Sequence, residues 1–179
     1  MKKRLFIAIP ISAKSIKYIL HWEKKQKVEI NWISSTDLHI TLIPPFYEDS
    51  EATSIEKMRS IKNLLTKFIL DFNLIEIRKA QIDRKSRPLI LWIRGDTNYN
   101  LQELLKNLNK IFFSDVQPLE FIPHITLARF KAGKINLNKF KNIKINLVEK
   151  VTKITLYESV TPEKNLKRKY LKLAEVPLK

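Results

Sequence analysis

The sequence predicts an α+β fold in which the sheets are antiparallel. Strand-like and helix-like segments are mixed along the chain without the regular βαβ alternation of a parallel sheet. The composition is that of an ordinary globular protein, with 44% hydrophobic and 29% charged residues in a chain of 179, and a chain of this length can bury a real core. No Ser/Gly/Pro-rich linker interrupts the chain, so residues 1–179 are expected to form a single domain.

Two strands and two helices are expected in the first half of the chain. In order, these are a strand over 5–9, a helix over 12–28, a strand over 38–43 and a helix from 53 to 68. The second strand should stop at Pro44 and Pro45, because proline cannot donate to a sheet ladder. The second helix is expected to begin at the capping box Thr53-Ser-Ile-Glu56, after which apolar residues recur at helical spacing as far as Phe68.

The second half is expected to be richer in strands. The expected elements are strands over 72–84 and 88–94, a helix capped by Asp96 or Thr97, and strands over 124–130, 143–157 and 170–176. Leu89–Ile93 is almost wholly apolar, which predicts a central strand. The helix carries one apolar face, formed by Leu101, Leu104, Leu105, Leu108, Ile111 and Phe112.

The composition excludes several kinds of functional site. The chain has no cysteine, which excludes disulfides, zinc ribbons, iron–sulfur clusters and thiol nucleophiles. Its two glycines, Gly95 and Gly133, are too few for a P-loop or a dinucleotide-binding fingerprint. Three histidines leave little room for a histidine-rich metal centre. We therefore expect no cofactor and no metal.

The charge of the chain favours a polyanionic partner. Lys and Arg number 34 against 18 Asp and Glu, giving a formal net charge of +16, and residues 131–172 hold 12 of the basic residues and 3 of the acidic ones. Nucleic acid is the obvious partner, although a lysine-rich composition from AT-biased coding gives the same surplus. The longest apolar run, over 5–11, is far shorter than the roughly 20 residues of a membrane span. We expect a cytoplasmic monomer without a membrane partner.

One short motif occurs twice and carries the chemistry. Residues 38–42 read Leu-His39-Ile-Thr41-Leu, and residues 123–127 read Pro-His124-Ile-Thr126-Leu. Each copy lies in a predicted strand, so its histidine and threonine point to the same face while the isoleucine between them points to the other. A single His-X-Thr is usually a half-buried polar pair, but a tandem copy that uses two of three histidines indicates a site.

Two such strands facing one another suit phosphoryl transfer. A neutral histidine can take a proton from the attacking oxygen while a protonated one gives a proton to the leaving oxygen, and the ordinary pKa of histidine, near 6.5, allows either role. The threonine hydroxyls can hydrogen-bond the non-bridging phosphate oxygens.

The chain resembles the 2H phosphoesterases, and among them the bacterial and archaeal RNA 2′,3′-cyclic phosphodiesterases once named 2′-5′ RNA ligases. The resemblance covers nearly the whole chain. It runs through Arg4–Ile9, Trp32, both motifs with Asp37 and Arg129 beside them, Pro88–Trp92, Leu156–Ser159, Tyr170 and Pro177-Leu178. The sequence departs from relatives at Ile43–Phe46, where they have a glycine-containing turn, and at Glu163–Lys169, which lacks their glycine.

The resemblance implies a bilobal fold with pseudo-twofold symmetry, in which two antiparallel sheets line a central cleft and helices pack outside. It assigns His39 as proton donor and His124 as proton acceptor, with Thr41 and Thr126 as phosphate ligands. The implied reaction opens a 2′,3′-cyclic phosphate at an RNA end to a 2′-phosphomonoester, and some members also join RNA halves, such as tRNA halves, through a 2′-5′ bond.

Two further residues are candidates for substrate contacts. Arg129 matches a family arginine that binds phosphate, yet strict alternation puts it on the face opposite His124, so it reaches the cleft only if the strand twists or ends there. Phe46 is the better candidate for stacking on a base, whereas Phe6 and Trp92 are expected in the core. His21 has no partner motif and is expected on the surface.

Two other functions stay open from the sequence. The first keeps the chemistry but takes a small cyclic nucleotide, such as an ADP-ribose cyclic phosphate. The second is a noncatalytic RNA-binding module on the same fold, which the two intact His-X-Thr pairs disfavour because a binding protein needs no matched acid and base.

Overall fold

The structure is a computed structural model, and it describes residues 2–61, 66–79, 89–113, 121–131, 136–161 and 168–179. Its strands form two four-stranded antiparallel sheets. The elements, in chain order, are β1 (Lys3–Pro10), α1 (Ala13–Lys25), η1 (Ser35–Asp37), β2 (His39–Glu48), α2 (Glu51–Ser60), β3 (Phe68–Lys79), β4 (Leu89–Gly95), α3 (Tyr99–Phe113), β5 (His124–Phe130), η2 (Leu137–Phe140), β6 (Ile143–Val151), β7 (Lys153–Val160) and β8 (Lys169–Pro177). The predicted α+β class is confirmed.

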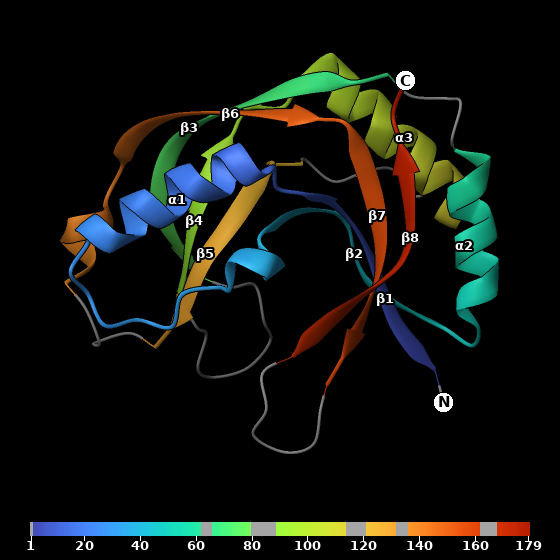
Figure 1. The fold of residues 1–179 in the computed structure, drawn as a ribbon, viewed down its shortest axis with the longest axis horizontal. Helices are drawn as coiled ribbons and strands as arrows, with labels where there is room; N and C mark the ends of the chain where they lie inside the picture. Colours follow the sequence, from blue (N-terminus) through green and yellow to red (C-terminus); the bar gives the residue numbers. More distant parts are fainter. Residues whose placement is uncertain (1, 62–65, 80–88, 114–120, 132–135, 162–167) are drawn as a thin grey trace.

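The two sheets have the same internal plan. The first has the order β2-β1-β7-β8 and the second the order β5-β4-β3-β6, and Figure 1 shows them as two lobes. We call them lobe 1 and lobe 2. In each lobe a motif strand, β2 or β5, occupies one end of the sheet and pairs with β1 or β4 respectively. The bilobal, pseudo-twofold arrangement is therefore present.

Two helices pack against the lobe whose strands do not flank them in the chain. Helix α1 lies between β1 and β2 in the chain but packs against lobe 2, where the buried Glu149 of β6 accepts hydrogen bonds from the Ser12 backbone N–H and hydroxyl at the α1 N-terminus. Helix α3 lies between β4 and β5 but packs on β2 and α2 in lobe 1. Figure 1 shows α1 over the second sheet and α3 beside α2 at the first.

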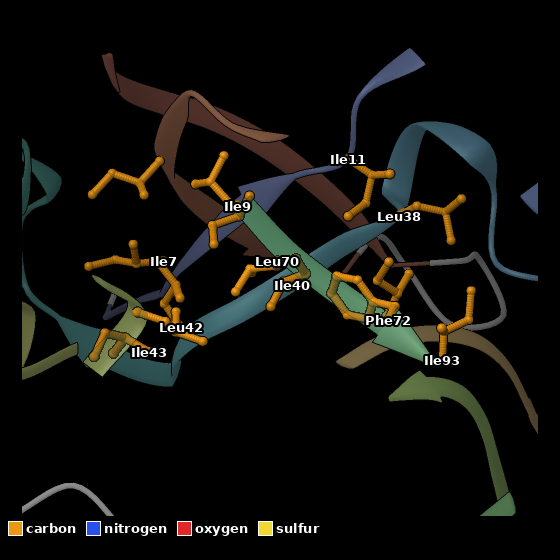
Figure 2. Close-up of a cluster of buried hydrophobic side chains, with 14 of the residues drawn as sticks. Ile7, Ile9, Ile11, Leu38, Ile40, Leu42, Ile43, Leu70, Phe72 and Ile93 are labelled. Carbon is orange, nitrogen blue, oxygen red and sulfur yellow. The ribbon is translucent and has the colours of Figure 1, made fainter. Parts of the chain in front are cut away.

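A single apolar core joins the lobes. Figure 2 shows Ile9 and Ile40 of lobe 1 in the same cluster as Leu70, Phe72 and Ile93 of lobe 2. The apolar side chains of the α3 face are buried in this core, apart from Ile111, which is half-buried. Among the described residues, no helix combines the length and the apolar character needed to cross a bilayer.

Several expected boundaries differ from those observed. Strand β2 continues through Pro44 and Pro45 to Glu48. Both prolines lie exposed on an end strand, opposite a shift in the pairing with β1, so neither removes a hydrogen bond from the interior of a sheet. Segment 143–157 divides at Thr152 into two strands that belong to different lobes.

The helix starts also differ from the predicted caps. The N-cap of α2 is Ser50 rather than Thr53, and its hydroxyl accepts from the Ala52 N–H. At α3 the Asn98 side chain accepts from the Leu101 N–H, whereas the Thr97 hydroxyl donates to the Phe121 carbonyl. Helix α2 ends at Ser60, and Phe68 opens β3 instead of extending the helix. Residues 62–65 and 80–88, which the predicted helix and hairpin included, lie outside the described residues.

Candidate active site

Both motif strands present their polar residues on one face. His39 and Thr41 on β2 are half-buried, and so are His124 and Thr126 on β5, while the isoleucine between each pair is fully buried. Ile40 is part of the core in Figure 2, so the imidazole and hydroxyl of its strand point away from that core. The alternation read from the sequence holds in both motifs.

The two imidazoles are held in the same way by the backbone. Nδ1 of His39 lies 2.6 Å from the carbonyl oxygen of Asp37, and Nδ1 of His124 lies 2.9 Å from that of Ile122. A carbonyl oxygen only accepts hydrogen bonds, so each Nδ1 carries the proton. In the neutral ring Nε2 is then unprotonated, and in the protonated ring Nε2 can donate. Each histidine can thus serve as base or as acid through Nε2.

The electrostatic surroundings distinguish the two rings. Burial lowers the pKa of both histidines below the ordinary value of 6.5, and the positive charge of Arg129 lowers both further. His39 also feels a neighbouring His124, which lowers its pKa, and the Asp37 carboxylate, which raises it. Arg129 thus acts on both imidazoles, and the strands that carry them, β2 and β5, are in contact.

A β-bulge explains how Arg129 comes to this face. Leu91 pairs with Ala128 while the next residue, Trp92, pairs with Thr126, so Leu127 is an extra residue on β5. A bulge shifts the phase of the alternation by one residue. Leu127 and Ala128 are consequently both buried and Arg129 is exposed. The strict alternation assumed from the sequence fails here, and the arginine shares the face of His124.

Lobe 1 has the same bulge with different chemistry. Ile7 pairs with Ile43 and Ala8 with Thr41, which makes Leu42 the extra residue. The position equivalent to Arg129 is therefore Pro44. The two lobes contribute the same histidine and threonine, but lobe 2 alone adds a cation at this position.

Aromatic rings surround His39. Phe6 of β1 and Tyr170 of β8 have ring centroids 5.2 and 5.4 Å from that of the imidazole. Tyr157 of β7 stacks on Phe6 with centroids 5.1 Å apart. Phe6 was expected in the core, and it is buried, but its ring packs beside the catalytic candidate.

A single indole packs on His124. The Trp92 ring centroid lies 4.3 Å from the imidazole centroid, with the planes at 47°. Trp92 was also expected in the core, yet it is only half-buried and lies on the motif face of β4. The part of Trp92 that is buried is therefore covered by residues of the motif face, His124 among them.

The remaining sequence candidates lie elsewhere. The Phe46 ring contacts Phe112 and Phe113 of α3, with centroids 5.8 and 5.6 Å apart, which occupies the ring within lobe 1 and does not favour base stacking. Trp32 packs edge-on against Trp22 and forms a bridge to Ala128. His21 is exposed on α1, as expected.

The sequence did not single out the surroundings of each histidine. Tyr170 and Asp37 lie in segments that resemble the family, but nothing in the motif spacing pointed to their contacts with His39. Trp92 and Glu76 are cross-strand neighbours, and such pairing is not readable from one sequence. Within the described ranges, no three His, Asp or Glu side chains gather as a metal-ligand set.

Comparison with solved structures identifies the fold. The structure of E. coli LigT in its apo form matches over 99% of this chain and 98% of its own, with a TM-score of 0.69 and 22% identity. TT0787 of Thermus thermophilus matches over 98% of this chain and 97% of its own, with a TM-score of 0.74 and 19% identity. This chain has the LigT fold.

The LigT fold extends to related proteins and agrees with the sequence resemblance. A structure described as a phosphoesterase matches with a TM-score of 0.68 at 23% identity, covering 99% of each chain. LigT has also been solved with phosphate, 3′-AMP, ATP and NADP⁺. No protein-family model and no curated protein matches the sequence. The likeness thus rests on the fold, and the pair of motif strands occupies matching places in its two lobes.

Proposed function

We propose that this chain is a 2H phosphoesterase that hydrolyses 2′,3′-cyclic phosphate at RNA ends, leaving a 2′-phosphomonoester, without a metal ion. The observation that carries the proposal is the pair of imidazoles, each with Nδ1 held by the carbonyl two residues earlier, so that proton transfer to or from a substrate is left to Nε2. The LigT fold supports the same class of reaction.

The surroundings support His39 as the acid. The Asp37 carboxylate favours the protonated form of His39, whereas the residue at the equivalent place before His124 is Ile122. Arg129 lowers the pKa of both rings, but His124 has no such carboxylate among its electrostatic neighbours, so it is better suited to stay neutral and act as the base. This assignment follows the general rule that different environments separate two similar groups into acid and base.

The reaction then needs two proton transfers. Nε2 of His124 takes a proton from water as its oxygen attacks phosphorus. Nε2–H of protonated His39 gives a proton to the 3′ oxygen as the bond between phosphorus and that oxygen breaks, and the phosphate stays on the 2′ oxygen. Thr41, Thr126 and Arg129 bind the non-bridging oxygens and stabilise the charge that develops on them.

Ligation would use the same groups. When a 5′-hydroxyl replaces water as the nucleophile, the identical transfers join two RNA pieces through a 2′-5′ bond. Substrates of this kind, tRNA halves among them, would meet the enzyme in the cytoplasm, where we propose that it acts as a monomer in one 179-residue domain.

The decisive experiment is a hydrolysis assay in EDTA. An RNA oligonucleotide ending in 2′,3′-cyclic phosphate is incubated with the protein, and ³¹P NMR distinguishes 2′- from 3′-phosphomonoester. We expect the 2′ product at a rate that EDTA leaves unchanged, and no product from the His39→Ala/His124→Ala double variant. Loss of activity in EDTA with recovery in Mg²⁺ or Mn²⁺ would replace this mechanism with a metal-centred one.

The second candidate function is hydrolysis of a small cyclic nucleotide, such as an ADP-ribose cyclic phosphate. The small nucleotides bound in the LigT structures favour it, whereas the net charge of +16 favours RNA. Comparing kcat/KM for the oligonucleotide and for a cyclic mononucleotide decides between them. A preference for the oligonucleotide that weakens with added salt supports RNA, and equal values support the small nucleotide.

A further inference from the structure

A chain of side-chain contacts leads from β3 to the proposed base. The Trp92 indole N–H donates to Oε1 of Glu76 across 3.2 Å, and the same oxygen accepts from Nε of Arg78 at 3.1 Å. The Trp92 ring in turn packs on the His124 imidazole. Glu76 thus reaches His124 through one intervening ring.

The sheet register places these residues in a row. Glu76 pairs directly with Trp92, and Trp92 pairs with Thr126. Directly paired residues on neighbouring strands point to the same face, so all three side chains lie on the face of the motif. The Glu76 side chain is only 14% exposed, and Arg78, whose guanidinium also lies 5.8 Å from the Trp92 ring centroid, balances its charge.

The other lobe lacks this row. Ala8 pairs with Thr41 and Thr155 pairs with Ala8, so an alanine and a threonine stand where lobe 2 has Trp92 and Glu76. The LigT fold therefore does not require an indole and a carboxylate at these positions. Their presence beside only one of the two histidines points to a role in what that histidine does.

We propose that Glu76 is a positioning residue, which fixes the Trp92 indole against His124 so that Nε2 of this imidazole stays aimed at the attacking oxygen. The proposal rests on the proposed function, in which His124 is the base. The indole acts again after the proton transfer, because a cation within about 6 Å of an indole centroid is attracted to the ring face. Glu76 itself touches neither substrate nor imidazole.

Other charges around His124 make this attraction useful. Arg129 on its own strand opposes a positive charge on the ring, and a protonated His39 on β2 does the same. The Ile122 carbonyl and the Trp92 ring face are the neighbours that favour the imidazolium. Replacing the indole with an apolar side chain that keeps the imidazole buried should lower the pKa of His124 further and weaken the base.

The test compares matched glutamate variants. Glu76→Met frees the indole, Glu76→Gln keeps an oxygen that can accept from it, and Glu158→Met is the control. Glu158 is also a strand glutamate, with a side-chain exposure of 17% and a lysine, Lys3, as its partner at 3.3 Å, but it is on β7 in lobe 1, where it pairs with Leu5 and Leu171. We expect kcat to fall about 10-fold in Glu76→Met with KM little changed, to recover within about threefold of the wild type in Glu76→Gln, and to stay unchanged in Glu158→Met.

A titration of the histidines by NMR supplies the second readout and needs no substrate. In Trp92→Leu the pKa of His124 should fall by about half a unit, in Glu76→Met by less, and that of His39 should stay constant in both. The proposal is overturned if Glu76→Met and Trp92→Leu leave the His124 titration unchanged, or if His39 moves by the same amount. It is equally overturned if Glu76→Gln loses as much kcat as Glu76→Met. Should the protein lack cyclic phosphodiesterase activity, the proposed function fails, and the titration still decides whether Glu76 and Trp92 control His124.

Discussion

The His39 and His124 sites share a backbone and differ in almost everything around it. Both have the same His-Ile-Thr-Leu motif, the same Nδ1 contact to a carbonyl and the same bulge at the leucine. Around His39 the neighbours are Phe6, Tyr170 and the Asp37 carboxylate. Around His124 the aromatic neighbour is Trp92, and no carboxylate acts on the ring. The Arg129 cation acts on both histidines. A symmetric frame therefore carries an asymmetric site, which two unlike proton transfers require.

The largest expected effect comes from removing either imidazole. His39→Ala and His124→Ala should each reduce kcat by ~10²–10⁴-fold, the usual contribution of one general acid or base. The double variant should be little worse than either single one, because the two groups act as a unit. Single-turnover rates on the cyclic-phosphate oligonucleotide measure this. Near-normal activity in either single variant would remove the proposed mechanism.

The threonines test whether the two lobes hold the phosphate equally. Thr41→Val and Thr126→Val keep the shape of the side chain but remove its hydrogen-bond donor, and loss of one such donor costs about 10²-fold or more in kcat. We expect Thr41→Val to be the more damaging, because Arg129 supports Thr126 while lobe 1 has Pro44 at the equivalent position. Both should affect an oligonucleotide and a cyclic mononucleotide alike. Equal losses in the two variants would mean that Arg129 contributes nothing beyond Thr126.

The helices that the halves exchange differ in a way that stability should reveal. The buried face of α3 is apolar, whereas α1 buries Glu23, whose pKa burial raises to about 7. A raised carboxyl pKa makes the folded state bind more protons, so its stabilising effect is present below the ordinary value of 4.5 and is lost as pH rises through about 7.

Glu23→Gln should remove this dependence on pH. Denaturant unfolding at pH 5 and pH 8 measures the free energy of unfolding, and the wild type should lose about 1–2 kcal/mol relative to Glu23→Gln between the two pH values. If the free energies of unfolding of the two proteins changed equally between pH 5 and pH 8, burial would not raise the pKa of Glu23.

The smallest expected effect concerns Asp37. Asp37→Asn keeps the backbone carbonyl that fixes His39 but removes the charge that raises its pKa. The acid must be protonated, so kcat/KM falls as pH rises through the pKa of His39, which lies below 6.5 in the free protein. We expect Asp37→Asn to move the basic limb of the pH–rate profile, which reports His39, by a few tenths of a pH unit to lower pH. The acidic limb, which reports His124, should stay in place. A shift in the acidic limb instead would reverse the two roles.

The sequence pointed to the proposed reacting groups but not to their surroundings. The motif repeat identified both histidines and threonines because the two-residue period of a strand decides which residues share a face. That same rule misplaced Arg129, since a bulge changes the phase and leaves no mark in the residue types. Pro44 and Pro45 predicted the end of a strand that in fact continues to Glu48, because proline ends a strand only where the sheet needs the N–H that proline lacks. Trp92 and Glu76 are 16 residues apart in the sequence. Their contact depends on the register between two strands, and local sequence patterns do not contain that register.

The exchange of α1 and α3 has a consequence for how the molecule opens. Each sheet is packed by a helix that comes from the other lobe's stretch of chain, lobe 1 is covered by α2 as well, and one apolar core runs through both lobes. Local unfolding that releases one sheet exposes apolar surface of both and carries nearly the full cost of global unfolding. The spacing of the two imidazoles is consequently established once, in the same cooperative step that folds the chain. In the proposed reaction, a cyclic phosphate would bind between two histidines whose separation is already set by folding.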